Sequence, residues 1–163
     1  MVPAPGMPPG TIGAMASTNH DTVTLDDANE YFVRQARKVL AERGPVEGAA
    51  RQLLVAALKE AGPATRRLRA LWALQSTGSL DDALLAGALK DVDPSVRGWA
   101  VRLIAQQWTA GVPALAELAK AEPSAQVRRE LASALSYLPL AQRAAIAEPL
   151  LARAEDAQDH NID

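Results

Sequence analysis

Short clusters of turn-forming residues divide most of this chain into segments of similar length. Each cluster combines Gly, Pro, Ser or Asp, which favour turns, and the segments between them are rich in Ala and Leu. Both residues favour helices over strands. Helices joined by loops this short must pack as antiparallel neighbours. The clusters predict helices near residues 28–42, 47–61, 64–77, 81–90, 94–108, 111–121, 124–137 and 141–154.

An apolar residue followed by arginine recurs near the start of four of these predicted helices. From arginine to arginine the intervals are 35, 28 and 31 residues. A repeat of this period indicates stacked helical hairpins, because one hairpin cannot bury both of its apolar faces alone. We therefore expect an all-α, right-handed superhelix of about four helical hairpins over residues 25–156. The recurring pairs are Val33-Arg34, Leu68-Arg69, Val96-Arg97 and Val127-Arg128.

Two tryptophans fall in the predicted helix 94–108. Trp99 shares a spacing of three and four residues with Val96, Leu103 and other apolar residues, which places it on the inward face. Trp108 lies at the helix end, where it would cover the hairpin turn. The pattern predicts that Trp99 belongs to the core.

The two ends of the chain differ from its middle. Residues 1–24 are rich in Pro, Gly and Ser and predict a disordered lead, with neither the basic start of a signal peptide nor a membrane span. Residues 157–163 predict a truncated or frayed tail. Stacked repeats expose apolar end faces unless they are capped, so we expect Leu150 and Leu151 to be partly exposed. Self-association through this end stays open.

Composition argues against several kinds of chemistry. A net charge of −2 gives no overall attraction to nucleic acid. The chain has no cysteine, so it cannot form disulfides, thiolate metal sites or a covalent c-type haem. Its two histidines, His20 and His160, fall in the end segments, away from the fixed neighbours that a ligand or general base needs. We therefore expect no catalytic, cofactor-binding or metal-binding residues, and no enzyme.

Several segments resemble a known repeat family. "DPSVR" and "PSAQVRRELASAL" are similar to HEAT repeats, in which a helix typically begins Asp-Pro-x-x-Val-Arg. The run "NEYFVRQARKVLAERG", "LRALWALQSTGSLDDALL", "DPSVRGWAVRLI", "VRRELASALSYLP" and "LLARAEDAQDHN" resembles, in order and spacing, the HEAT-repeat region of bacterial membrane-bound dehydrogenase-like proteins. The resemblance covers roughly residues 25–161.

The resemblance implies a cell-envelope location and a connecting role between redox modules. In that family a sugar-dehydrogenase-like propeller precedes the repeats and a c-type cytochrome module usually follows them. This sequence has no propeller and no Cys-x-x-Cys-His motif, so no catalytic or haem-binding residue carries over to it. We therefore expect a fragment of a larger protein or a stand-alone copy of the repeats.

The repeated arginines have two interpretations. They could line one edge of the stack and grip phosphate or carboxylate, which a guanidinium group fits well. Alternatively, each could bond an acidic side chain or loop carbonyl of the adjacent repeat, with Asp91, Asp93 and Glu130 as candidate partners. A position repeated in every unit usually serves the unit itself, so we favour the structural interpretation. The four candidates are Arg34, Arg69, Arg97 and Arg128.

A second basic group comprises Arg66, Arg67 and Arg129. Basic residues beside Trp72 could bind nucleic acid, as in some HEAT-like repair glycosylases, but those folds need a much larger basic surface. The sequence predicts a non-catalytic scaffold for a protein partner or for neighbouring domains. The alternatives are an accessory protein like the phycobilisome lyases, which have HEAT-like repeats, and a nucleic-acid-binding HEAT-like protein.

Overall fold

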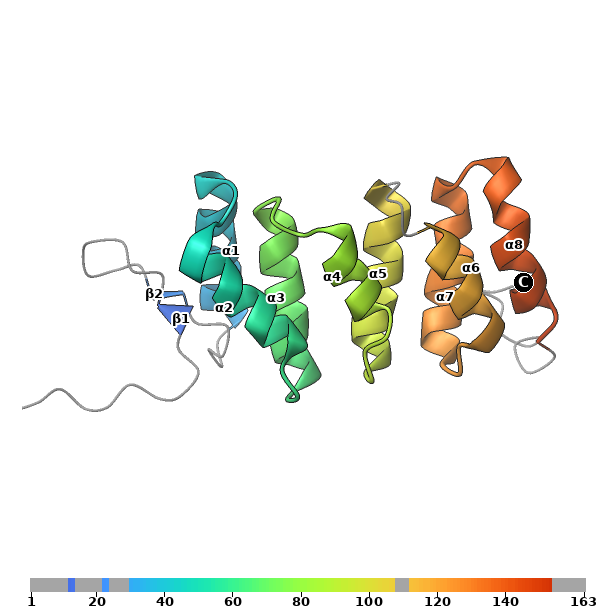
Figure 1. Cartoon of the computed structure of the whole chain (residues 1–163), viewed down its shortest axis with the longest axis horizontal. Helices are drawn as coiled ribbons and strands as arrows, with labels where there is room; N and C mark the ends of the chain where they lie inside the picture. Colours follow the sequence, from blue (N-terminus) through green and yellow to red (C-terminus); the bar gives the residue numbers. More distant parts are fainter. Residues whose placement is uncertain (1–11, 14–21, 24–29, 108–111, 154–163) are drawn as a thin grey trace, which may run out of the picture. The chain divides into compact units, whose positions relative to one another are not determined.

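The structure is a computed structural model, and it describes residues 12–13, 22–23, 30–107 and 112–153 (Figure 1). It confirms the all-α class and the eight predicted helices. Trp108, both histidines and the tail 157–163 lie outside the described residues, as does most of the predicted disordered lead. The helices are α1 (Glu30–Arg43), α2 (Gly48–Lys59), α3 (Ala64–Ser76), α4 (Asp82–Ala88), α5 (Pro94–Gln107), α6 (Val112–Ala121), α7 (Ala125–Ala134) and α8 (Leu140–Leu151).

The chain divides into two compact units, Met1–Leu80 and Asp81–Asp163. We call them unit 1 and unit 2. Unit 1 contains α1, α2 and α3, and its two-residue strands β1 (Ile12–Gly13) and β2 (Thr22–Val23) pair antiparallel. In this unit α3 packs against both α1 and α2. Its buried apolar side chains are Val33, Leu40, Leu54, Ala57, Leu58, Ala70, Leu71, Ala73 and Leu74.

The loops of unit 1 are joined by a serine. Ser79 follows α3, and its hydroxyl oxygen accepts a hydrogen bond from the backbone N–H of Val46 at 2.9 Å. Val46 lies in the loop between α1 and α2. Gly44 and Gly78, which follow α1 and α3, have φ angles of 81° and 65°. Glycine adopts this left-handed backbone region without steric cost, which explains its use after these two helices.

Unit 2 contains α4 to α8 and a short 3-10 helix, η1 (Leu135–Tyr137), that extends α7. Helices two apart in the sequence pack side by side: α5 packs along α7, and α6 packs along α8. This arrangement places equivalent helices of successive hairpins next to each other, so their apolar faces are shared. The buried apolar side chains include Leu84, Leu85, Val96, Ala100, Ile104, Leu115, Val127, Leu131, Leu138 and Ile146.

Two predicted burial states are wrong. Trp99 is only half-buried, although Val96, Ala100 and Ile104 on the same helix are fully buried. Its ring lies under the guanidinium group of Arg102 on the outer side of α5, because the smaller apolar residues alone fill the inward face. At the other end, Leu150 is 3% exposed and belongs to the core, whereas Leu151 is 74% exposed as predicted.

Candidate functional site

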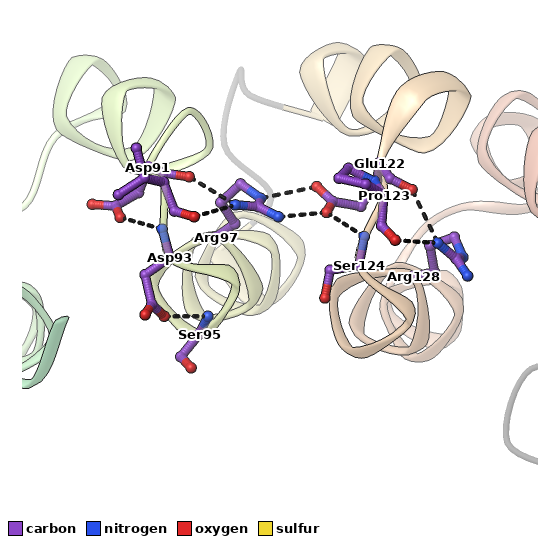
Figure 2. Close-up of polar contacts among 9 residues, drawn as sticks. Asp91, Asp93, Ser95, Arg97, Glu122, Pro123, Ser124 and Arg128 are labelled. Carbon is purple, nitrogen blue, oxygen red and sulfur yellow. Dashed lines mark hydrogen bonds and ion pairs between the residues drawn. The ribbon is translucent and has the colours of Figure 1, made fainter.

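The most extensive polar network in unit 2 centres on Arg97, near the start of α5 (Figure 2). Its Nη1 donates to the backbone carbonyl oxygen of Asp91 at 2.8 Å and to that of Val92 at 3.2 Å. Its Nε and Nη2 donate to the two carboxylate oxygens of Glu122, at 2.9 and 2.6 Å. One guanidinium group therefore joins the loop before α5 to the loop before α7.

Glu122 is the buried partner in this pair. Its side chain is 1% exposed and that of Arg97 is 12% exposed. The same carboxylate also accepts a hydrogen bond from the backbone N–H of Ser124 at 2.9 Å. A charge this deeply buried is tolerated only when it is paired and hydrogen-bonded. Removing one partner from such a pair lowers the free energy of unfolding by about 3–5 kcal/mol. The contact therefore fixes how these two loops meet.

Asp91 occupies the equivalent position one repeat earlier. Its carboxylate accepts from the backbone N–H of Asp93 at 2.8 Å, as Glu122 accepts from Ser124. Asp91 lies six residues before Arg97, and Glu122 lies six residues before Arg128. Both loops thus have the same backbone-to-carboxylate turn followed by the same arginine.

Arg128 repeats the loop contact of Arg97 at the start of α7. It is 3% exposed, and its Nη1 donates to the backbone carbonyl oxygens of Glu122 at 3.1 Å and Pro123 at 2.9 Å. Figure 2 shows the two arginines in corresponding positions, each turned back onto the loop that precedes its own helix. Arg143 of α8 makes a related contact, donating through Nε to the carbonyl oxygen of Leu138 at 2.9 Å.

In α3 the arginine that contacts the loop before its own helix is Arg67, two residues before the predicted Arg69. Arg67 is 6% exposed and donates to the carbonyl oxygen of Gly62, five residues earlier. Arg97 and Arg128 also donate to the carbonyl five residues earlier. We call Arg67, Arg97 and Arg128 the loop-anchoring arginines; they are spaced by 30 and 31 residues.

The other two predicted members of the series have different partners. Arg69 pairs with the carboxylate of Glu30 on α1. Arg34 is exposed and donates through Nε to the backbone carbonyl oxygen of Glu30 at 3.4 Å. Arg69 thus bonds an acidic side chain of another helix, as the structural interpretation predicts, and neither of these contacts is the loop contact of Arg67, Arg97 and Arg128.

Electrostatics reinforce the Arg97 pair. The hydrogen bond to Glu122 raises the pKa of the Arg97 guanidinium group above its ordinary value, and the charges of Glu122, Asp91 and Asp93 act in the same direction. Partial burial opposes them. Arg97 is therefore charged at every pH at which the protein is handled.

The predicted candidate partners of the arginines are partly correct. Asp91 does contact Arg97, but through its backbone carbonyl group. Asp93 accepts a hydrogen bond from the backbone N–H of Ser95 at 2.8 Å, as a helix-capping residue. Glu130 pairs with Arg102, whose Nη2 lies 2.9 Å from its carboxylate.

In the predicted basic group, one arginine is buried and another is paired with a carboxylate. Arg67 is buried against its loop carbonyl, and Arg66 pairs with Glu60 at 2.6 Å. Arg129 is exposed on α7, in the other unit. Because Arg67 is buried, it cannot contribute to the nucleic-acid-binding surface suggested by the sequence.

The outer side of α5 and α7 carries a polar hollow of about 180 Å³. Trp99 lies beside it under Arg102, whose guanidinium carbon is 4.9 Å from the centre of the Trp99 ring. A smaller hollow of about 50 Å³ shares Arg102 and Glu130 with it. We call the lining of the larger one the α5–α7 hollow: Arg102, Ala105, Gln106, Glu130, Ser133, Ala134 and Tyr137.

Within the described ranges, no three His, Asp or Glu side chains gather closely enough to hold a metal ion. Each helix among the described residues is too short or too polar to cross a membrane. What the arrangement does chemically is hold loops together and present polar side chains on an outer helical surface.

Glu122 was not among the predicted residues, although a spacing in the chain points to it. An acidic residue stands six positions before both Arg97 and Arg128. This acid-to-arginine spacing marks the turns before α5 and α7, but it does not mark Arg67, because residue 61 is alanine.

Comparisons were made with protein-family models, with curated proteins and with solved structures, and the chain matches none of them.

Proposed function

We propose that this chain is a HEAT-type repeat module that acts as a non-catalytic scaffold for protein partners. The observation that carries the proposal is the bridge from Arg97 to Glu122, which joins equivalent loops of neighbouring repeats. By its resemblance, the module is related to the repeat region of envelope dehydrogenase-like proteins and connects other modules or chains there.

The packing of the helices supports a repeat architecture. In unit 2, α5 lies along α7 and α6 along α8; in unit 1, α1 packs against α3. In repeat proteins each unit contacts mainly its neighbours, and the stability is a sum of unit and neighbour terms. The proposed superhelix extends this side-by-side stacking through successive hairpins.

The use of the loop-anchoring arginines supports a scaffold rather than an anion-binding edge. Arg97 and Arg128 direct guanidinium nitrogens to carbonyl groups of their own loops, and Arg97 also engages Glu122. Such donors hold the backbone in place and are not offered to a ligand. The repeated basic positions are thus explained by the repeat itself.

The α5–α7 hollow is the surface we propose for a partner segment. It combines Tyr137, which is 48% exposed, with Arg102 and Glu130, which hold each other in position. Tyrosine and arginine are enriched among residues that dominate protein interfaces. The mechanism is geometric, because stacked helices hold such a surface in a fixed shape.

The test is affinity capture with the immobilised full chain and a matched pair of variants. Arg102→Ala combined with Tyr137→Ala alters the α5–α7 hollow, and Gln142→Ala changes an exposed position on α8 as the control. We expect a protein that wild type and control capture equally and that the double variant captures about tenfold less, as for interface residues that dominate binding.

Three results would contradict the proposal. One is equal capture by both variants. Another is capture only of nucleic acid, abolished by nuclease and by moderate salt, which would favour the nucleic-acid alternative. The third is co-purification of a chromophore that the chain transfers to a partner, which would favour the lyase-like alternative. Melting curves of all variants establish that folding is unchanged.

A further inference from the structure

A group of arginines on the α1–α3 surface of unit 1 surrounds a single carboxylate. Arg69 of α3 pairs with Glu30 in the first turn of α1; the Arg69 side chain is 14% exposed and that of Glu30 is 52% exposed. The hydrogen bond from Arg69 lowers the pKa of Glu30, and the charges of Arg69, Arg34 and Arg37 lower it further. Three guanidinium groups therefore act on one carboxylate, and we call Arg34, Arg37 and Arg69 the arginine cluster.

Arg37 is held in position without using its full hydrogen-bonding capacity. Its guanidinium carbon lies 5.0 Å from the centre of the Trp72 ring, a cation–π distance. Its Nε is buried and has no hydrogen-bond partner among the described residues. A buried donor without an acceptor costs free energy, so Arg37 is held here by its contact with Trp72 and not by a hydrogen bond at Nε.

The charges of the cluster favour an anionic ligand. Three positive side chains act on one negative side chain, Glu30, so these four residues together carry an excess of two positive charges. The planar guanidinium group matches a carboxylate in geometry as well as in charge. Glu30 already pairs with Arg69, so one carboxylate is held by this cluster within the protein itself.

We propose that the arginine cluster binds an acidic peptide segment of a protein partner. The inference rests on the proposed scaffold function, since it names the chemistry of one partner. A Glu or Asp side chain of the peptide pairs with Arg37 and Arg34, and a second one competes with Glu30 for Arg69. A peptide fits better than a nucleic acid because the cluster is confined to two helices, whereas Glu42, Glu47 and Glu60 are exposed elsewhere on the unit and would repel a phosphate backbone.

The experiment is calorimetric titration of the full chain with two blocked peptides, acetyl-Gly-Glu-Glu-Glu-Glu-Gly-amide and its Gln counterpart. We expect the Glu peptide to bind and the Gln peptide not to bind at low salt. Arg37→Gln should weaken binding about tenfold, as the loss of one charge-assisted contact. Glu30→Gln should strengthen it, because the competing carboxylate is gone. Arg129→Gln, an exposed change in unit 2, should leave it unaltered.

An increase in peptide affinity with Glu30→Gln separates peptide binding from a structural role. If the Glu30–Arg69 pair served the structure only, breaking it would weaken the site. Equal binding of both peptides, or weaker binding by Glu30→Gln in a variant that melts like wild type, would overturn the inference. Tighter, Arg37-dependent binding of a single-stranded DNA 12-mer would overturn it in favour of nucleic acid. If the Glu peptide fails to bind while the α5–α7 hollow still captures a partner, this inference alone is refuted. If the peptide binds while the hollow captures no partner, only the proposed role of the hollow is refuted.

Discussion

At the scale of single residues, the buried carboxylate of Glu122 is the most demanding feature of the chain. It is 1% exposed yet charged against Arg97, and it also accepts a backbone hydrogen bond. Burial of this kind is stable only when every partner is present. The arrangement explains why an arginine, with several donors in one plane, stands here: a lysine could not contact the Asp91 carbonyl and both Glu122 oxygens together.

Trp99 shows where residue-level prediction reached its limit. The three-and-four spacing correctly placed Val96, Leu103 and Ile104 in the core, but it assigned Trp99 to the same face. A residue at the margin of an apolar stripe can turn outward when a neighbour such as Arg102 covers its ring. Sequence spacing does not contain that information.

Trp99→Ala should therefore destabilise the protein by about 1–2 kcal/mol, less than the loss of a fully buried aromatic ring. Leu103→Ala on the same helix is the reference, because Leu103 is 5% exposed and its truncation should cost about 2–5 kcal/mol. Urea denaturation of both variants measures the difference. A larger loss of stability for Trp99→Ala than for Leu103→Ala would show that Trp99 belongs to the core.

At the scale of elements, the helices were predictable, but the position of the loop-anchoring arginine within α3 was not. Clusters of Gly, Pro, Ser and Asp fix where helices end through local backbone preferences, so the predicted boundaries fall close to those observed. The choice between Arg67 and Arg69 depends instead on which side chain faces the preceding loop. That is a tertiary property, and the apolar-arginine pattern points to Arg69, because Arg67 follows Arg66 and not an apolar residue.

Arg67→Ala and Arg69→Ala provide a direct comparison of these two positions. Arg67→Ala removes a buried charged donor from the Gly62 carbonyl and should cost about 1.5–3 kcal/mol. Arg69→Ala removes a partly exposed ion pair with Glu30 and should cost about 0–1 kcal/mol. Denaturant unfolding measures both losses of stability. A larger loss for Arg69→Ala than for Arg67→Ala would identify Arg69 as the repeat arginine.

At the scale of the whole molecule, composition and periodicity predicted an all-helical chain, and that class is what the structure shows. The superhelix, the HEAT-type identity and the envelope location stay predictions, since they depend on the resemblance and on how successive hairpins continue. The structural interpretation of the repeated arginines, favoured from the sequence, agrees with the anchored loops at Arg97 and Arg128. The sequence analysis named Arg34 and Arg69 as possible carboxylate-binding residues, but not their grouping with Arg37, because the cluster forms only when α1 packs against α3.

The central claim is that Arg97 holds two neighbouring repeats together through Glu122, and hydrogen exchange along the full chain tests it most directly. In Arg97→Ala, we expect amide protection to fall in both α5 and α7, because one side chain joins the loops that precede them, while α1 to α3 keep theirs. Arg129→Ala, an exposed change on α7, should leave the pattern of wild type. Unchanged protection of α5 and α7 in Arg97→Ala would contradict the claim.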